Sequence, residues 1–111
     1  LLSLNILNTL NTYAKQADIP WLLIAIAPWQ QILGETPNTQ ETEFHNTIID
    51  WAEFNQVALI NTVPAIQTHA DPREFFHLQD GHYNMAGHRL LAGLIYLKLQ
   101  SDQLGLELDI R

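Results

Sequence analysis

The chain has 111 residues, of which 47% are hydrophobic and 15% are charged, and its formal net charge is −7. This composition is typical of one folded domain with a modest core, and it excludes a disordered chain. The five basic residues stand singly, so no basic patch exists that would bind nucleic acid or an anionic membrane. The chain lacks cysteine, and no apolar run is long enough to span a bilayer. Nothing here assigns a compartment.

The first half of the chain predicts a helix, a strand and a loop. Residues 2–17 carry apolar side chains at helical spacing, which predicts an amphipathic helix. These side chains are Leu2, Ile6, Leu10, Tyr13, Ala14 and Ala17. Residues 21–27 are continuously apolar, as expected for a strand buried on both faces of a parallel sheet. Residues 28–40 are expected to form a loop with a short helical turn at 29–33.

From Thr42 the helical spacing returns, and residues 57–63 then predict a second buried strand that is stopped by Pro64. The apolar face of this helix is expected to comprise Phe44, Ile48, Ile49, Ala52 and Val57. The order strand–helix–strand predicts a βαβ unit with parallel strands and a right-handed crossover. Residues 64–81 are expected to form a long loop, and such a loop in a compact α/β domain is usually functional.

The last helix is predicted from Met85 to Gln100, and residues 104–110 alternate apolar and polar side chains as an edge strand does. The residues expected to face inward are Leu90, Leu91, Leu94, Ile95 and Leu97. In this scheme the strand at 21–27 has one neighbour and a free apolar edge. An uncovered edge promotes association, so we expect that the segment normally follows further strands, or that the isolated chain self-associates through this edge or through residues 104–110.

The turn before the last helix concentrates the candidate chemistry. Asp80 and His82 flank Gly81, which places a carboxylate close to an imidazole, and Asn84 has the residue type and position of a helix N-cap. Gly87 is expected to allow close packing in the first helical turn. Because the turn follows a buried strand, it should lie beyond the carboxyl edge of the sheet, where sites are built. The residues alone also allow Asp80 a turn-forming role.

The sequence Asp-Gly-His-Tyr-Asn-x-x-Gly-His at residues 80–88, followed by an apolar helix, resembles the last block of the SGNH (GDSL-type) serine hydrolases. The specific match covers residues 76–92. The resemblance implies a flavodoxin-like, three-layer α/β/α domain with a parallel sheet, of which residues 1–111 are the C-terminal part. It also implies that Asp80 is the orienting acid and His82 the general base of a Ser-His-Asp triad. One residue separates the two here, whereas two is the commonest spacing in the family.

A reaction of this family needs no metal or organic cofactor, and the resemblance implies acyl or acetyl esters of lipids, sugars or polysaccharides as substrates. The serine nucleophile has no candidate, because the chain contains only Ser3 and Ser101 and neither lies in a Gly-Asp-Ser context. Loss of that nucleophile removes catalysis by a factor on the order of a million. We therefore expect this chain alone to be inactive. Its start at Leu1, without methionine, predicts a fragment of a longer polypeptide.

Two alternatives remain open. A non-catalytic α/β module would use the free strand edge and residues 104–110 for assembly. A metal site would draw on the imidazoles and the carboxylate of His77, Asp80, His82 and His88. Otherwise His77 is expected to pack in its loop, and His45, His69 and His88 are expected at the surface. Trp29, just after the first strand, is a candidate pocket wall.

Overall fold

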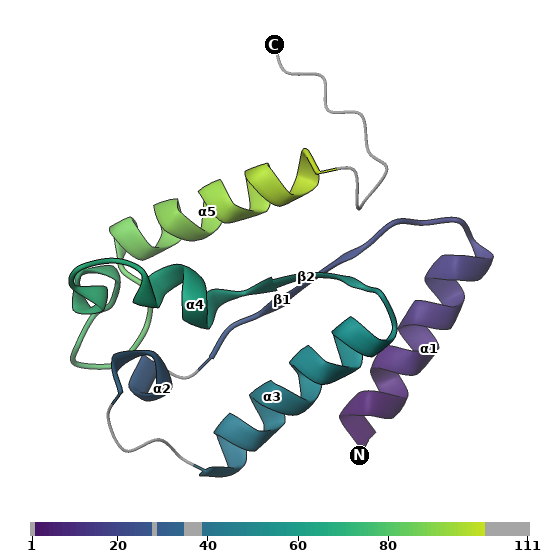
Figure 1. Ribbon diagram of the computed structural model, residues 1–111, viewed down its shortest axis with the longest axis horizontal. Helices are drawn as coiled ribbons and strands as arrows, with labels where there is room; N and C mark the ends of the chain where they lie inside the picture. Colours follow the sequence, from purple (N-terminus) through teal and green to yellow (C-terminus); the bar gives the residue numbers. More distant parts are fainter. Residues whose placement is uncertain (1, 28, 35–38, 102–111) are drawn as a thin grey trace.

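The computed structural model describes residues 2–27, 29–34 and 39–101, and these form a two-stranded parallel sheet with five α-helices and one 3-10 helix (Figure 1). In chain order the elements are α1 (Leu2–Gln16), β1 (Leu22–Ala25), α2 (Trp29–Leu33), α3 (Thr39–Phe54), β2 (Ala58–Asn61), α4 (Thr62–Gln67), η1 (Pro72–Phe75) and α5 (Met85–Leu99). The α/β class is confirmed. The larger three-layer sheet stays a prediction, and the strand expected at 104–110 lies outside the described residues.

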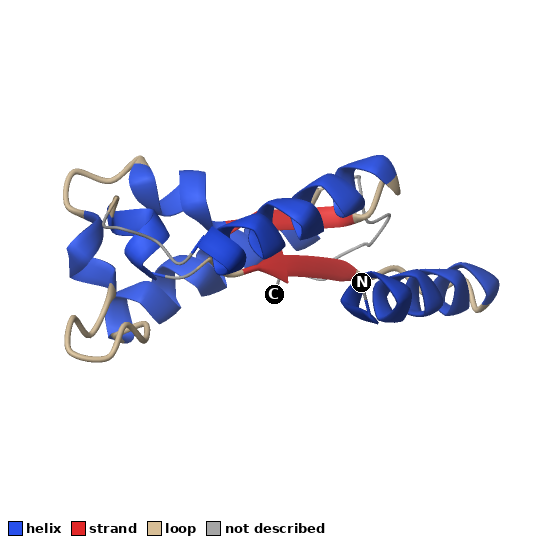
Figure 2. Cartoon of the chain, turned by 90° about the horizontal axis from the view of Figure 1, so that it is seen from below, coloured by secondary structure: helices blue, strands red, loops and turns tan. Residues whose placement is uncertain are grey.

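The βαβ unit is confirmed by the pairing of the strands. β1 and β2 run parallel in a register that sets Leu22 beside Ala58 and Ala25 beside Asn61, with α3 as the crossover between them. Figure 1 places α1 and α3 on one side of the sheet and α5 on the other, and Figure 2 shows α1 displaced to one side of the strands. In the described part of the chain, no helix is long and apolar enough to cross a membrane.

Both α1 and α3 end in the same backbone motif and lead directly into a strand. After α1, Asp18 adopts a positive φ of 56°, and the N–H of Ile19 donates to the carbonyl of Ala14. After α3, Gln56 has a φ of 55°, and the N–H of Val57 donates to the carbonyl of Ala52. These are Schellman ends, which satisfy free carbonyls and turn the chain sharply.

The second strand is shorter than expected, and residues 64–81 contain two helical segments. β2 ends at Asn61, whose side chain accepts the N–H of Val63 at 3.1 Å and so caps α4. Pro64 stands in the first turn of α4, where proline is tolerated because that N–H has no intrahelical partner. The expectation that Pro64 merely stops a strand was therefore wrong. Asp71 caps η1 in the same way through the N–H of Arg73.

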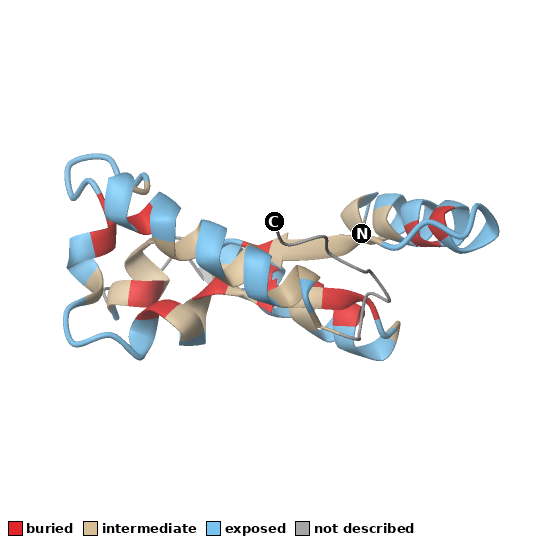
Figure 3. Cartoon of the chain, turned by 90° about the horizontal axis from the view of Figure 1, so that it is seen from above, coloured by how far each residue is buried: buried red, intermediate tan, exposed pale blue. Residues whose placement is uncertain are grey.

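The burial of several apolar residues differs from expectation (Figure 3). Four residues of the predicted stripe of α1 are 44 to 77% exposed: Leu2, Ile6, Leu10 and Tyr13. Instead Leu4 and Leu7 pack against the cluster formed around Trp51, because this is the face of α1 that meets α3. β1 is not buried on both faces, since only Ala25 of its residues is buried. Leu97 of α5 is also exposed.

A second core cluster lies beyond the carboxyl ends of the two strands. Its buried residues come from the end of β1, α2, α4 and η1: Ala27, Ile32, Ile66, Phe75 and Phe76. Trp29, Tyr83 and Leu90 pack against it. This cluster is the platform for the turn that precedes α5, because Phe76 and Tyr83 form an isolated antiparallel bridge at the base of that turn.

Candidate functional site

The turn at residues 77–82 is closed by its own backbone. The N–H of His77 donates to the carbonyl of His82 at 2.7 Å, and the N–H of Gly81 donates to the carbonyl of His77 at 2.8 Å. The antiparallel bridge between Phe76 and Tyr83 anchors both ends of the turn on the core. Residues between these anchors are therefore held in fixed geometry although most of their side chains face solvent.

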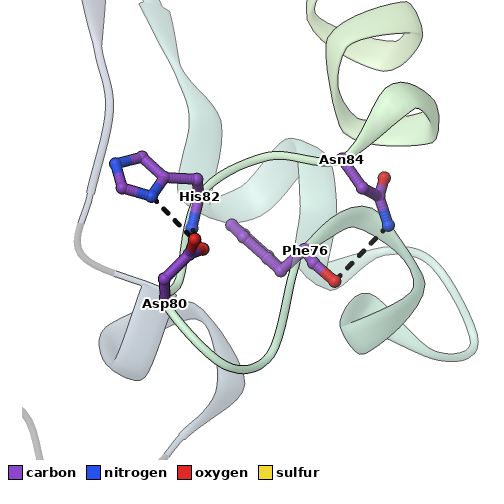
Figure 4. A network of polar contacts seen from close by, with 4 residues as sticks. All are labelled: Phe76, Asp80, His82 and Asn84. Atoms are coloured by element: carbon purple, nitrogen blue, oxygen red, sulfur yellow. Dashed lines mark hydrogen bonds and ion pairs between the residues drawn. The ribbon is translucent and has the colours of Figure 1, made fainter.

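Asp80 and His82 are brought together as the sequence predicted (Figure 4). The Nδ1 atom of His82 lies 3.2 Å from Oδ1 of Asp80, and the backbone N–H of His82 donates to the same oxygen at 3.0 Å. The side chain of His82 is 83% exposed and that of Asp80 is 59% exposed. The backbone N–H of His82 is the main cause that holds the pKa of the Asp80 carboxyl below its ordinary value. The Asp80 carboxylate therefore has two roles: it stabilises the turn through the backbone N–H of His82, and it contacts the imidazole of the same residue.

Gly81 makes this turn possible. Its φ is +76°, a left-handed conformation that favours glycine, and a Cβ atom added there would overlap the indole of Trp29. Trp29 begins α2 directly beyond the end of β1. The tryptophan therefore covers the turn from the side of the first strand, a contact between residues far apart in the sequence.

Asn84 fixes the start of α5 relative to the turn. Its Oδ1 accepts the N–H of Gly87 at 3.0 Å, which confirms the predicted N-cap. Its Nδ2 donates to the carbonyl of Glu74 at 2.7 Å, and Figure 4 shows the same amide directed at the carbonyl of Phe76. Gly87 is buried, and a Cβ there would meet the carbonyl oxygen of Phe75, so close packing is confirmed.

A groove of about 990 Å³ runs from the turn along β1. Its wall at the turn is formed by Gly81 and Trp29, so the expectation that Trp29 lines a pocket is confirmed. Much of the remaining lining is apolar and comes from α1, β1 and α3: Ile6, Leu7, residues 23–27, Phe44 and Ile48. An apolar groove with a carboxylate–imidazole pair above one end has the general form of a site for an apolar or amphipathic ligand.

His45 is a lining residue that sequence reasoning placed wrongly at the surface. It is 5% exposed, and its Nε2 lies 3.2 Å from Oδ1 of Asn61. Because that oxygen also accepts the backbone N–H of Val63, it acts as an acceptor, and His45 must carry its hydrogen on Nε2. The position of Asn61, an N-cap type directly after an apolar run, was the signal that could have indicated a polar partner here.

Thr62 and Tyr83 are polar residues that lie beneath the turn. The buried Thr62 hydroxyl donates to the carbonyl of Ala25 and accepts the N–H of Ala27, which ties the end of β1 to the start of α4. Burial raises the pKa of the Tyr83 phenol, and the neighbouring Thr62 hydroxyl offsets part of the rise. Among the described residues, the buried Oη of Tyr83 finds no hydrogen-bond partner of good geometry.

The remaining histidines do not converge on the site. His69, His77 and His88 are exposed, as expected for His69 and His88, and the rings of His69 and His88 lie edge-on to Phe75 and Tyr83. Among the described residues, no three histidine or acidic side chains are grouped so that they would hold a metal ion.

The two serines stand apart from the turn in the chain. Ser3 lies in the first turn of α1 and lines the groove whose end is formed by Gly81 and Trp29, and Ser101 donates to the carbonyl of Lys98 beyond the end of α5. α5 has 15 residues and begins directly after the turn, so it separates Ser101 from the turn by about 22 Å.

Comparison of the chain with protein-family models, with curated proteins and with solved structures finds no match.

Proposed function

We propose that this chain is the C-terminal part of an SGNH-type ester hydrolase, in which it supplies the general base His82 and the orienting acid Asp80. The observation that carries the proposal is the pairing of Nδ1 of His82 with Asp80 at 3.2 Å, on a turn held by backbone hydrogen bonds beyond the ends of the parallel strands. The motif at residues 80–88 adds the resemblance to the family.

The chemistry follows from this pairing. With Nδ1 directed at the carboxylate, Nε2 is the nitrogen available to a reacting hydroxyl. His82 would remove the proton of a serine hydroxyl as the serine attacks an ester carbonyl, and would then return the proton to the leaving alcohol. Asp80 would fix the tautomer of the ring and stabilise the imidazolium. A carboxylate with a lowered pKa stays ionised at neutral pH, as this role requires.

The serine and the oxyanion donors would come from polypeptide other than these 111 residues, because neither Ser3 nor Ser101 has the Gly-Asp-Ser context of the family's nucleophile. The chain by itself is then inactive. A lipid, sugar or polysaccharide ester is the substrate class, and the apolar lining of the groove suits an acyl chain.

The test is p-nitrophenyl acetate turnover by a polypeptide that contains these residues together with the preceding part of its reading frame. His82→Ala should lower kcat/KM on the order of a thousandfold or more. His69→Ala, at another exposed histidine, is the matched control and should leave turnover unchanged. Equal activity of His82→Ala and the unsubstituted protein would show that His82 is not the base. A Gly-Asp-Ser sequence encoded upstream of Leu1 would support the proposal.

A non-catalytic assembly module is the second candidate, and one observation favours it. β1 pairs with β2 alone among the described strands, and apolar residues remain uncovered beside it. In this second candidate function, the free edge of β1 would serve self-association.

A further inference from the structure

α1 carries apolar residues on two of its faces. One face, with Leu4 and Leu7, packs against α3 and the strands. The second face consists of Leu2, Ile6, Leu10 and Tyr13, which are 44 to 77% exposed. A surface helix of a monomer normally presents one apolar stripe and is polar elsewhere. α1 therefore has the pattern of a helix that packs between two partners, and the described residues supply one of them.

The free edge of β1 adjoins this second face. Three of the four residues of β1 are partly exposed, and Ile26, directly beyond the strand, is 56% exposed. Half of the residues of β2 are buried, so β1 is the less covered strand. Ile6 and Ile26 both line the groove, which joins the α1 stripe to the strand edge in one surface. We call this surface the α1–β1 face: the four exposed residues of α1, the strand β1 and Ile26.

The α1–β1 face is almost free of charge in a strongly acidic chain. Residues 1–27 contain one basic residue, Lys15, and one acidic residue, Asp18, so their formal charge is zero. The remaining residues then carry the whole net charge of −7. Charged residues are depleted from the centres of protein interfaces, and like charges facing one another cost several kcal/mol. The residues of this face are themselves uncharged, and Glu41 of α3 is the acidic residue that lines the adjoining groove, so repulsion of a second acidic copy is small here.

We propose that the α1–β1 face is the contact surface between two copies of this chain, related by a two-fold axis perpendicular to the sheet. An occupant must present an extended apolar strand and an apolar helical face side by side. The chain presents both on one surface, and a two-fold axis pairs that surface with itself. The axis sets β1 antiparallel to β1 of the other copy and gives a four-stranded sheet in the order β2-β1-β1-β2. It also brings the two α1 stripes together on one side of that sheet.

Such pairing satisfies the backbone groups at the free edge and extends a sheet to which the described residues of one copy contribute two strands. Two strands alone are at best marginally stable in water, and here α3 packs against them; a four-stranded sheet would add to the stability that this packing gives. The proposed face specifies the surface behind the self-association expected of this chain by itself, because a preceding strand in a complete esterase would occupy the same edge of β1.

Sedimentation velocity over a wide range of concentration tests the proposal on the chain itself. The unsubstituted chain should be a dimer. Ile26→Lys places a charge at the strand edge and Ile6→Lys places one on the α1 stripe, and each should weaken dimerisation about tenfold or more. Leu97→Lys is the matched control: Leu97 is 65% exposed on α5, and its replacement should leave dimerisation unchanged. Far-UV circular dichroism checks that each variant is folded.

Disulfide trapping gives a second measurement, because the chain contains no cysteine. Single cysteines placed in turn at residues 22–25 should include one that lies against its own copy across the axis. That variant should form a disulfide-linked dimer under mild oxidation faster than Leu97→Cys does, since bridged Cα atoms must approach to about 4.4–6.8 Å.

Three outcomes would overturn the proposal. The first is a chain that stays monomeric at all concentrations. The second is dimerisation that is unaffected by both Ile26→Lys and Ile6→Lys. The third is a dimer that Leu106→Lys and Leu108→Lys disrupt while Ile26→Lys does not, which would assign the contact to residues 104–110.

Discussion

Gly81→Ala is expected to destabilise the fold by about 2–5 kcal/mol, because two separate costs meet at this residue. The φ of +76° is left-handed, and an alanine held there costs about 1–2 kcal/mol. The new Cβ would also overlap the indole of Trp29, and relief of such overpacking typically costs about 1–3 kcal/mol. The Asp80–His82 contact should weaken as the turn adjusts.

A double-mutant cycle separates the two costs. In a Trp29→Ala background the collision is removed, so Gly81→Ala should cost only the about 1–2 kcal/mol of the backbone term. Urea unfolding followed by far-UV circular dichroism measures all four proteins, and this signal does not rely on the fluorescence of Trp29. A cost of Gly81→Ala below about 0.5 kcal/mol, or an equal cost in both backgrounds, would refute the contact between Trp29 and the turn.

Three further predictions concern the same part of the molecule. Tyr83→Phe removes a buried hydroxyl that lacks a good partner, and it should stabilise the fold by about 1 kcal/mol in urea unfolding; a loss of that size would mean that the hydroxyl is well bonded. Thr62→Val leaves the N–H of Ala27 and the carbonyl of Ala25 unpaired, and it should destabilise the fold by about 1–3 kcal/mol in the same assay. The pKa of Asp80 is lower in the folded than in the unfolded protein, so its carboxylate contributes stability above the unfolded-state pKa, and this stability is lost as pH falls through the folded-state pKa. In Asp80→Asn the urea concentration at the unfolding midpoint should therefore fall less steeply with decreasing pH. An unchanged acid profile for that variant would show that the carboxylate does not interact as described.

Local signals were sufficient for much of the fold and for the contact between Asp80 and His82. Helical spacing located α1, α3 and α5 to within three residues, and two apolar runs located both strands. The turn was also predictable, because Asp80, Gly81 and His82 are adjacent and interact mainly through their own backbone. Asn84 could be assigned as the cap of α5 for the same reason: its partner lies three residues away.

The misplaced features depend on tertiary contacts or on ambiguous local chemistry. His45 looked like a surface residue because nothing near it in the sequence reveals Asn61, its hydrogen-bond partner from the end of β2. Pro64 both ends strands and begins helices, and only the cap by Asn61 distinguishes these roles. The apolar stripe of α1 predicted the helix but not which face of it would be buried, because Leu4 and Leu7 on another face make the contact with α3.

The complete esterase and the dimer would both add a strand at the free edge of β1, but the added strand runs in opposite directions in the two cases. Gly81 and Trp29 stand at the end of the groove beyond the carboxyl end of β1, so the turn overhangs that end. A strand added parallel to β1 would end there, about 4.8 Å away in the sheet, and could deliver a serine to His82. A second copy joined across a two-fold axis runs antiparallel, and its β1 begins where that serine would have to stand. The dimer of this chain should therefore hydrolyse no p-nitrophenyl acetate above the rate of the His82→Ala variant. Turnover by the pure dimer that is lost both on His82→Ala and on Ser3→Ala would show that the serine is present within these residues, and its assignment to other polypeptide would then be wrong.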